Sequence, residues 1–280
     1  MRAFPAIPPV RRTAALLGGA DADAQAFITA AGITDATQKD AVNQLVVDWK
    51  ATGLWDSTVA IYPFVGGSAS SHKWNLKDPR DLDAAYRITF AGGLSHTANG
   101  ILPNGTTGYG DTHISLNQNV PQYSLSVGFH SGTQTVPGAG DYYVFGTSGW
   151  GLDFYFNDRV YFATSQSNIS GSGVFGNFTG ITDCRGLWIA SLRHFDELAL
   201  YRNAVSVGTN TTERWGYWPN LNPTSPYPLF LFAQNVTGSA QYFSPMQCRF
   251  VYVGPGISST AASSLGSIIN TFQTNLGRAI

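Results

Sequence analysis

Residues 123–129 read YSLSVGF, and this stretch decides the fold class. Every second position from Tyr123 to Phe129 is apolar or aromatic and alternates with serine or glycine. A period of two is typical of a β-strand with one buried face. Other segments of similar composition are separated by turn-forming stretches, and they are Tyr86–Phe90, Tyr142–Phe145, Leu152–Phe156, Arg159–Ala163, Leu187–Arg193, Leu198–Arg202, Leu229–Ala233 and Arg249–Val253. The sequence therefore predicts a mainly-β jelly-roll sandwich.

Composition favours the same class. Of the 280 residues, 43% are hydrophobic and 12% are charged, and glycine contributes 31 residues. The charged fraction is about half that of typical globular domains. A net charge of −1, with no basic run beyond Arg11 and Arg12, argues against nucleic-acid binding. No apolar run reaches the ~18 residues of a membrane helix, so membrane insertion is not expected.

Helices are predicted on both sides of the sandwich. The clearest follows Asp35, which can cap it, while Gln38 completes a capping-box pattern and Gly53 ends it. Its apolar stripe is expected to pack against the β-domain, and it consists of Val42, Leu45, Val46 and Trp49. A shorter helix is predicted over Ala22–Ala31, and a C-terminal helix over Ala261–Leu276.

These elements divide the chain into four regions. Residues 1–20 are predicted to be an extended arm, because Pro5, Pro8 and Pro9 favour polyproline II. Free termini are usually disordered unless something holds them, so we expect this arm to contact a neighbouring subunit. Residues 21–84 form a helical region and connector, residues 85–256 the sandwich, and residues 257–280 the C-terminal helix.

The chain has two cysteines, Cys184 and Cys248. Two cysteines in a chain of this length are no disulfide framework. The favoured interpretation is two separate buried thiols, and a single bridge is the alternative.

The segment Tyr142–Val253 resembles the laminin-G-like, concanavalin-type lectin domains. The order of its motifs carries this resemblance. GLDFYF begins at Gly151, GLWIASL at Gly186 and LALYRN at Leu198, and CRFVYVG begins at Cys248. The resemblance implies a two-sheet sandwich of concanavalin type.

Residues 21–278 also resemble a group of phage virion proteins. These join a helix pair, a connector, a lectin-like sandwich and a C-terminal helix. The matching pieces here are Ile61–Gly67, Asn75–Pro79, Pro103–Thr112 and Phe272–Arg278. The resemblance implies a tail, fibre or capsid-surface role in a virion, without catalytic residues.

The sequence contains no recognisable catalytic motif. Retaining glycosidases use two carboxylates ~5–5.5 Å apart, and the β-glucanases of this fold class carry both as glutamates on one strand. This chain has only Glu197 and Glu213, far apart in sequence. The neighbouring Asp78, Asp81 and Asp83 are interpreted as solvated turn residues. The histidines are scattered and interpreted as structural, and they are His72, His96, His113, His130 and His194.

One stretch suggests ligand binding. Between Thr211 and Tyr227 aromatic residues crowd a loop rich in proline and asparagine, and these are Trp215, Tyr217, Trp218 and Tyr227. Sugars present apolar C–H faces and polar rims, which suit aromatic platforms beside amide groups. Trp150, between two glycines, is a weaker candidate. The alternative is that these rings pack over the sandwich edge or against a neighbouring subunit.

The sequence favours a non-enzymatic structural protein of a bacteriophage virion, displayed on the tail or capsid and contacting host glycans. Its expected partners are other virion subunits, including copies of itself, because few repulsive charges suit a surface that associates. No cofactor and no metal are expected. Two alternatives stay open: a carbohydrate-binding module or degraded glycosidase of a secreted protein, and a purely architectural subunit without a sugar ligand.

Overall fold

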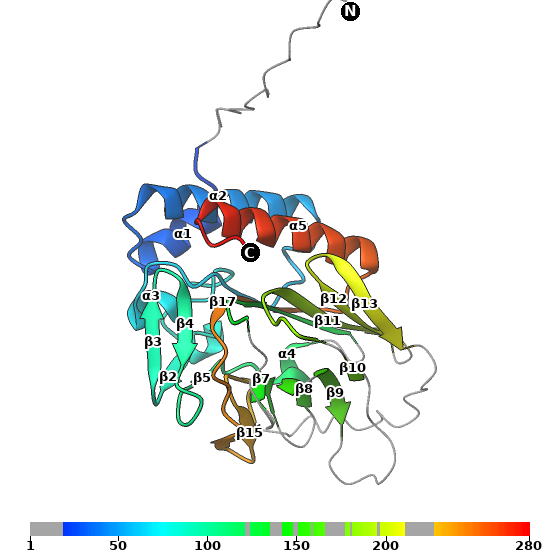
Figure 1. Ribbon diagram of the computed structural model, residues 1–280. Coiled ribbons are helices and arrows are strands. Elements are labelled where there is room, and N and C mark those ends of the chain that lie inside the picture. The colour runs from blue at the N-terminus through cyan, green and yellow to red at the C-terminus, as the bar shows by residue number, and fades with distance from the viewer. Residues whose placement is uncertain are drawn as a thin grey trace, which may run out of the picture.

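The computed structural model describes residues 19–120, 124–134, 142–147, 151–157, 159–165, 177–179, 181–194, 197–210 and 227–280. These residues form three layers (Figure 1). A helical layer of α1 (Ala22–Ala30), α2 (Ala36–Ala51) and α5 (Ser259–Asn275) covers one face of a first sheet, and a second sheet covers the other face. The predicted arm is outside the described residues except for Gly19 and Ala20, which are exposed.

The first sheet is antiparallel, with the order β13-β12-β11-β6-β17-β4-β3, and β1 pairs with one end of β17. Its strands are β1 (Ala60–Tyr62), β3 (Leu94–Thr97), β4 (Gly100–Pro103), β6 (Leu125–Ser131), β11 (Gly186–His194), β12 (Glu197–Arg202), β13 (Val205–Asn210) and β17 (Cys248–Gly254). β1 comes from the predicted connector, so that region supplies a strand to the same sheet as β17.

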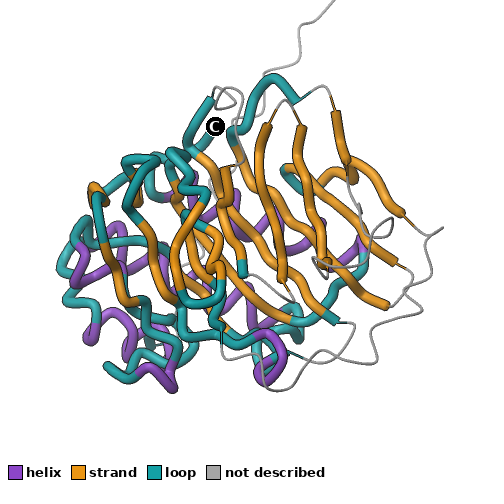
Figure 2. Tube along the Cα trace, turned by 90° about the horizontal axis from the view of Figure 1, so that it is seen from below, coloured by secondary structure: helices purple, strands orange, loops and turns teal. Residues whose placement is uncertain are grey.

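The second sheet has the order β10-β9-β8-β7-β14-β5-β2, and its strands lie side by side in the view from below (Figure 2). Its strands are β2 (Thr89–Ala91), β5 (Tyr109–Asp111), β7 (Tyr142–Gly146), β8 (Gly151–Asn157), β9 (Arg159–Ser165), β10 (Asn177–Thr179) and β14 (Phe230–Leu231). A separate hairpin of β15 (Gln234–Val236) and β16 (Ser239–Gln241) follows β14. Short helical turns complete the described chain, and they are α3 (Ala69–His72), η1 (Asp83–Ala85) and α4 (Leu116–Asn119).

The main hydrophobic core lies between the two sheets. Phe129 of β6 and Phe145 of β7 meet edge to face at 5.6 Å, and both are fully buried. The indole N–H of Trp188 donates to the Cys184 carbonyl at 2.9 Å, which satisfies the polar atom of a buried ring. Cys184 and Cys248 are both free and buried, which confirms the interpretation of two separate thiols.

A second core lies between the helical layer and the first sheet. Trp49 of α2 packs against Phe250 and Tyr252 of β17 at ring distances of 6.3 and 5.4 Å. Phe272 of α5 meets Phe250 at 5.9 Å. The apolar stripe of α2 therefore packs against the sandwich, as predicted.

This second core corrects one prediction made from residues 123–129, namely that one face of the strand is exposed. β6 was predicted to be half-buried, but every residue from Leu125 to Ser131 is buried. Its serine and glycine positions face the helical layer instead of solvent. A Cβ at Gly128 would lie 2.2 Å from the Tyr252 ring, so glycine is needed where that ring crosses the strand.

The predicted helices are present, with ends within about two residues of their expected positions. The capping box of α2 is only half formed. The Asp35 carboxylate accepts from the Gln38 backbone N–H at 2.8 Å, as expected. The Gln38 side chain accepts instead from the Gly66 N–H at 2.7 Å, which ties α2 to the chain after β1.

Most predicted strands lie where expected, and two are corrected. The strand predicted over Tyr86–Phe90 shortens to β2, which begins at Thr89, because Tyr86 is left-handed (φ 59°) where it ends η1. The strand predicted over Leu229–Ala233 shortens to β14, because Phe232 is also left-handed (φ 66°). The predicted fold class, a mainly-β sandwich with two N-terminal helices and one C-terminal helix, is confirmed.

Candidate binding surface

Of the predicted site residues, the structure describes only Tyr227, which is half-buried. Trp150, Trp215, Tyr217 and Trp218 lie outside the described residues. Their role in binding stays a prediction.

Tyr227 lies against the β15–β16 hairpin. Its carbonyl accepts a hydrogen bond from the Thr147 hydroxyl at 3.1 Å, at the end of β7. A Cβ placed on Gly238, in the hairpin turn, would lie 3.7 Å from the edge of the Tyr227 ring. The Asn235 side chain donates to the Pro228 carbonyl at 2.8 Å. The predicted aromatic loop therefore rejoins the described chain beside this hairpin.

Around the hairpin the structure brings aromatic side chains together, and we call them the hairpin surface: Tyr109, Tyr143, Phe230, Tyr242 and Phe243. Tyr109 lies 4.8 Å from Phe230 and 6.5 Å from Phe243, measured between ring centroids. Tyr143 and Tyr242 lie 5.5 Å apart.

The hairpin surface is on the side of the second sheet that faces away from the helical layer, where β15 projects at the bottom of Figure 1. Tyr242 is 49% exposed, which makes it the most accessible ring of the group. Tyr109 and Phe243 are half-buried, whereas Tyr143 and Phe230 are buried beneath them. An exposed ring that rests on buried rings is a firm apolar platform open to solvent.

The backbone of the hairpin is held tightly. Thr237 in its turn is left-handed, and so are Phe232 and Tyr242 on either side of it, with φ of 51°, 66° and 54°. Such conformations cost ~1–3 kcal/mol each and persist only where surrounding contacts impose them. Local contacts supply this constraint, because buried Asn235 accepts from the Gly238 N–H at 2.8 Å and Tyr143 donates to the Tyr242 carbonyl at 3.2 Å. These contacts fix the backbone beneath the aromatic rings.

Polar groups border the rings. Thr237, Ser239 and Gln241 are exposed on the hairpin. Their hydroxyl and amide groups both donate and accept hydrogen bonds. The hairpin surface thus combines an aromatic platform with uncharged hydrogen-bonding groups.

Sequence reasoning missed most of this surface. It placed Tyr142–Phe145 and Leu229–Ala233 as strands but assigned no role to residues 234–243. The available signal was Asn235-Val-Thr-Gly238, a turn-forming run flanked by short segments, which indicates a hairpin. Its contact with β7 joins residues about 100 positions apart, which local pattern does not reveal.

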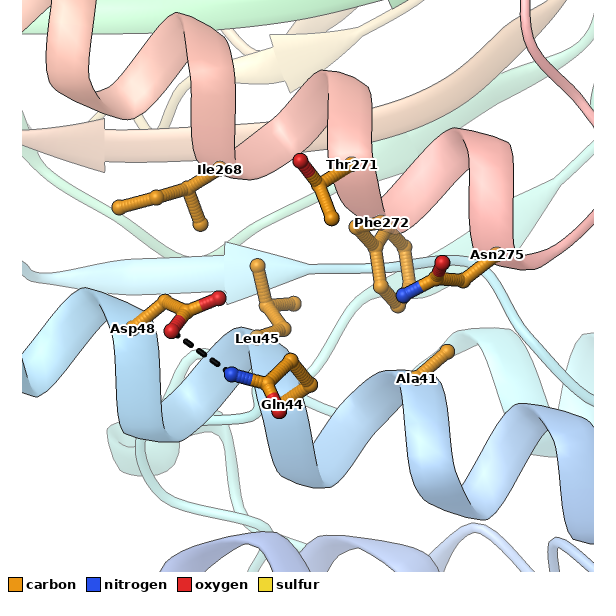
Figure 3. A pocket seen from close by; sticks show the side chains of 8 residues that line it. All are labelled: Ala41, Gln44, Leu45, Asp48, Ile268, Thr271, Phe272 and Asn275. Atoms are coloured by element: carbon orange, nitrogen blue, oxygen red, sulfur yellow. Dashed lines mark hydrogen bonds between the residues drawn. The ribbon is translucent and has the colours of Figure 1, made fainter. Parts of the chain in front are cut away.

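A shallow depression lies between α2 and α5 (Figure 3). It measures about 140 Å³ including the part open to solvent, less than half of a usual ligand pocket. Leu45 and Phe272 form its floor, and Gln44 donates to Asp48 across its rim at 2.8 Å. This depression is a seam between packed helices.

The acidic residues considered for catalysis form ion pairs with neighbouring cations where the structure describes them. Asp81 pairs with Lys73 at 2.7 Å, and Asp83 pairs with Arg87 at 2.9 Å, both at the surface. Asp78 pairs with Arg80. Glu197 pairs with Arg193, and Glu213 lies outside the described residues.

Two histidines are deeply buried. Burial, with smaller contributions from His96 and Arg278, lowers the pKa of His72 to about 3. Burial likewise lowers the pKa of His130 to about 3, with Arg249 and Arg278 adding to the effect. The Nδ1 atoms of His72 and His96 are 3.0 Å apart, so one ring donates to the other. These contacts agree with the structural interpretation of both residues.

Among the described residues, no three histidine, cysteine or acidic side chains gather as metal ligands would. None of the described helices is long and apolar enough to cross a bilayer.

No family model matches this chain, and neither does any curated protein sequence. Solved structures do match its fold. One concerns botulinum neurotoxin type C, whose cell entry is dependent upon interaction with two ganglioside molecules; it has a TM-score of 0.51 and 11% identity over 78% of this chain and 53% of that one. Another is the binding domain of botulinum neurotoxin DC in complex with rat synaptotagmin II. It has a TM-score of 0.51 and 13% identity over 77% of this chain and 52% of that one.

This chain therefore spans about half the length of these neighbours. At 11–13% identity the likeness shows the fold alone, and function has to be argued from the site. The chain has the antiparallel, lectin-like β-sandwich fold that its sequence motifs predict.

Proposed function

We propose that this chain is a carbohydrate-binding β-sandwich module without catalytic activity, and that the hairpin surface is its binding site. The observation that carries the proposal is Tyr242, a half-exposed ring resting on Tyr143 and fixed by a strained, well-anchored backbone. A sugar ring can stack its C–H face on Tyr242 while its hydroxyls bond to Gln241 and Ser239.

The fold neighbours support a binding role. The neurotoxin type C neighbour interacts with gangliosides, whose headgroups are oligosaccharides, and the neurotoxin DC neighbour is a binding domain. Both support ligand recognition by this type of sandwich, and neither identifies the ligand of this chain.

The same proposal includes Trp215, Tyr217, Trp218 and Trp150 as further contributors. The first three belong to the loop that ends at Tyr227, and Tyr227 lies against the hairpin turn. Loops on a rigid sandwich are where binding residues usually lie.

A binding experiment tests this proposal. The chain is applied to a glycan array, and its tightest ligand is then titrated calorimetrically into the wild type and into Tyr242→Ala. Loss of the platform is expected to weaken binding about tenfold, equivalent to ~1.4 kcal/mol. Val205→Ala is the matched control, because Val205 is 68% exposed on β13 at the edge of the other sheet. Absence of any glycan ligand, or equal losses in both variants, would retire the proposal.

The non-catalytic part of the proposal has its own test. It is supported by the fold neighbours, which are described as binding domains, and by the absence of a paired-glutamate motif in the sequence. We expect no release of reducing ends when the protein is incubated with β-glucans or with its array ligand. Hydrolysis that disappears when one aspartate is replaced would contradict it.

We further propose that the module is carried on a bacteriophage virion, on the tail or the capsid surface, in contact with other virion subunits and with copies of itself. The supporting observations are the motif order over residues 21–278 and a charged fraction of only 12%. Peptide mass fingerprinting of purified particles should detect the chain at a fixed stoichiometry. Its absence from washed particles would contradict the virion proposal and leave the carbohydrate-binding proposal standing.

A further inference from the structure

Resting on the proposed function, the structure points to a narrower ligand class: we infer that the hairpin surface takes an uncharged saccharide and discriminates against sugars that carry a carboxylate. The inference follows from the charges in and around the surface.

The segment that builds most of the surface carries no charge. Residues 227–247 contain no aspartate, glutamate, lysine, arginine or histidine. The adjoining strand β7, over Tyr142–Gly146, is also free of charged residues. Every hydrogen-bonding side chain that these residues offer is a hydroxyl, an amide or a phenol, which suits sugar hydroxyls.

One acidic residue of the described chain borders the surface. Asp111 of β5 is the register partner of Phe230, so a carboxyl group lies at the border of the platform. Burial raises the pKa of Asp111, while the His113 backbone N–H, which donates to it at 2.8 Å, opposes that shift. A second carboxylate brought close to Asp111 would be disfavoured, because like charges disfavour each other's ionised form.

Cations near this border are already paired. Arg87 donates to Asp83 at 2.9 Å and also contacts Asp81 at 3.2 Å. Lys73 pairs with Asp81 at 2.7 Å. A sugar carboxylate entering the surface would lose water without gaining a charged donor, which is unfavourable. A neutral sugar incurs no such loss.

One cation in the sequence before Tyr227 provides a direct check. Arg214 lies outside the described residues, and Glu213 precedes it in the sequence. Were Arg214 the receptor for a sugar carboxylate, its replacement would selectively abolish binding of acidic glycans. Arg214→Gln therefore belongs in the experiment.

The test compares matched glycans by calorimetry: a ganglioside headgroup oligosaccharide, the same oligosaccharide without sialic acid, and a neutral cello- or xylo-oligosaccharide. We expect a neutral member to bind at least tenfold more tightly than the sialylated one. Its affinity should change less than twofold between 50 and 500 mM salt, because no ion pair is screened. Gln241→Lys should raise affinity for the sialylated glycan at 50 mM salt, and most of this gain should disappear at 500 mM salt, where the new charge is screened.

The outcomes separate this inference from the proposed function. Tighter binding of the sialylated glycan, lost in Arg214→Gln or at high salt, overturns the inference and leaves carbohydrate binding standing. If a neutral glycan binds equally well to the wild type and to Tyr242→Ala, the ligand class is correct but the ligand binds at another surface. That result overturns the hairpin surface as the site. Binding of none of the glycans overturns both.

Discussion

Mild acid should destabilise this protein through two buried histidines. His72 and His130 are 1% and 2% exposed, and each has a pKa of about 3 in the folded state. An unfolded chain returns histidine to its ordinary pKa of about 6.5. Since the unfolded state then binds more protons, the contribution of each histidine is fully present above pH 6.5. It is lost as the pH falls from there toward 3.

The size of the effect follows from the linkage relation. Between pH 7.5 and pH 5 each buried neutral histidine removes about 2 kcal/mol from the free energy of unfolding, so the pair removes about 4 kcal/mol. Carboxylates contribute little in this window, because their unfolded pKa values lie near 4. A loss of about 4 kcal/mol is a large part of the ~5–15 kcal/mol by which domains are stable.

Urea denaturation at pH 7.5 and pH 5, followed by tryptophan fluorescence, measures this loss. The double variant His72→Gln/His130→Gln is the control, because neither glutamine titrates. It should be less stable at pH 7.5 but lose much less than the wild type on acidification, with a residual loss from His96, whose pKa burial also lowers. If the wild type loses no more than the double variant, the reasoning from burial is wrong.

Three further results are expected. Gly128→Ala should lower the free energy of unfolding by ~1–3 kcal/mol, because its methyl group would lie 2.2 Å from the confined Tyr252 ring. Gly254→Ala, whose Cβ would find its nearest atom at 3.6 Å, should change it by less than about 1 kcal/mol, and equal losses would contradict the packing argument. Arg278→Ala should cost about 3 kcal/mol in urea denaturation, because this buried side chain donates to carbonyls that include that of Phe64 at 3.0 Å; an unchanged midpoint would exclude that role. Both free cysteines are buried, so a thiol reagent should label neither in the native protein and both in urea, and rapid native labelling would refute their burial.

The spacing of apolar residues and the helix-capping residues predicted those elements whose sequence signals are local. The stripe from Val42 to Trp49 and the capping aspartate at position 35 define α2, and the alternation in residues 123–129 indicates β6. What failed depends on tertiary contacts. β6 alternates in sequence yet is buried on both faces, because helices from both ends of the chain cover its outer side. β1 has three residues, too few for a periodic signal, and exists because it pairs with β17.

The candidate site shows the same division. The aromatic residues between Thr211 and Tyr227 predicted a binding stretch there, and Tyr227 lies beside the hairpin. The rings of Tyr109, Tyr143 and Tyr242 are far apart in sequence, and the fold alone brings them together. Left-handed Phe232 and Tyr242 are also invisible to propensity, because neither residue type favours that conformation.

The central claim is that the hairpin surface binds a saccharide, and chemical-shift mapping tests it most directly. Isotope-labelled protein is titrated with the best neutral oligosaccharide from the array, and backbone amide signals are followed by NMR. The largest shifts are predicted in residues 234–243 and around Tyr109 and Tyr143, with little change at Gln44 and Asp48 between α2 and α5. Shifts concentrated between α2 and α5, with residues 234–243 unmoved at saturation, would contradict the account.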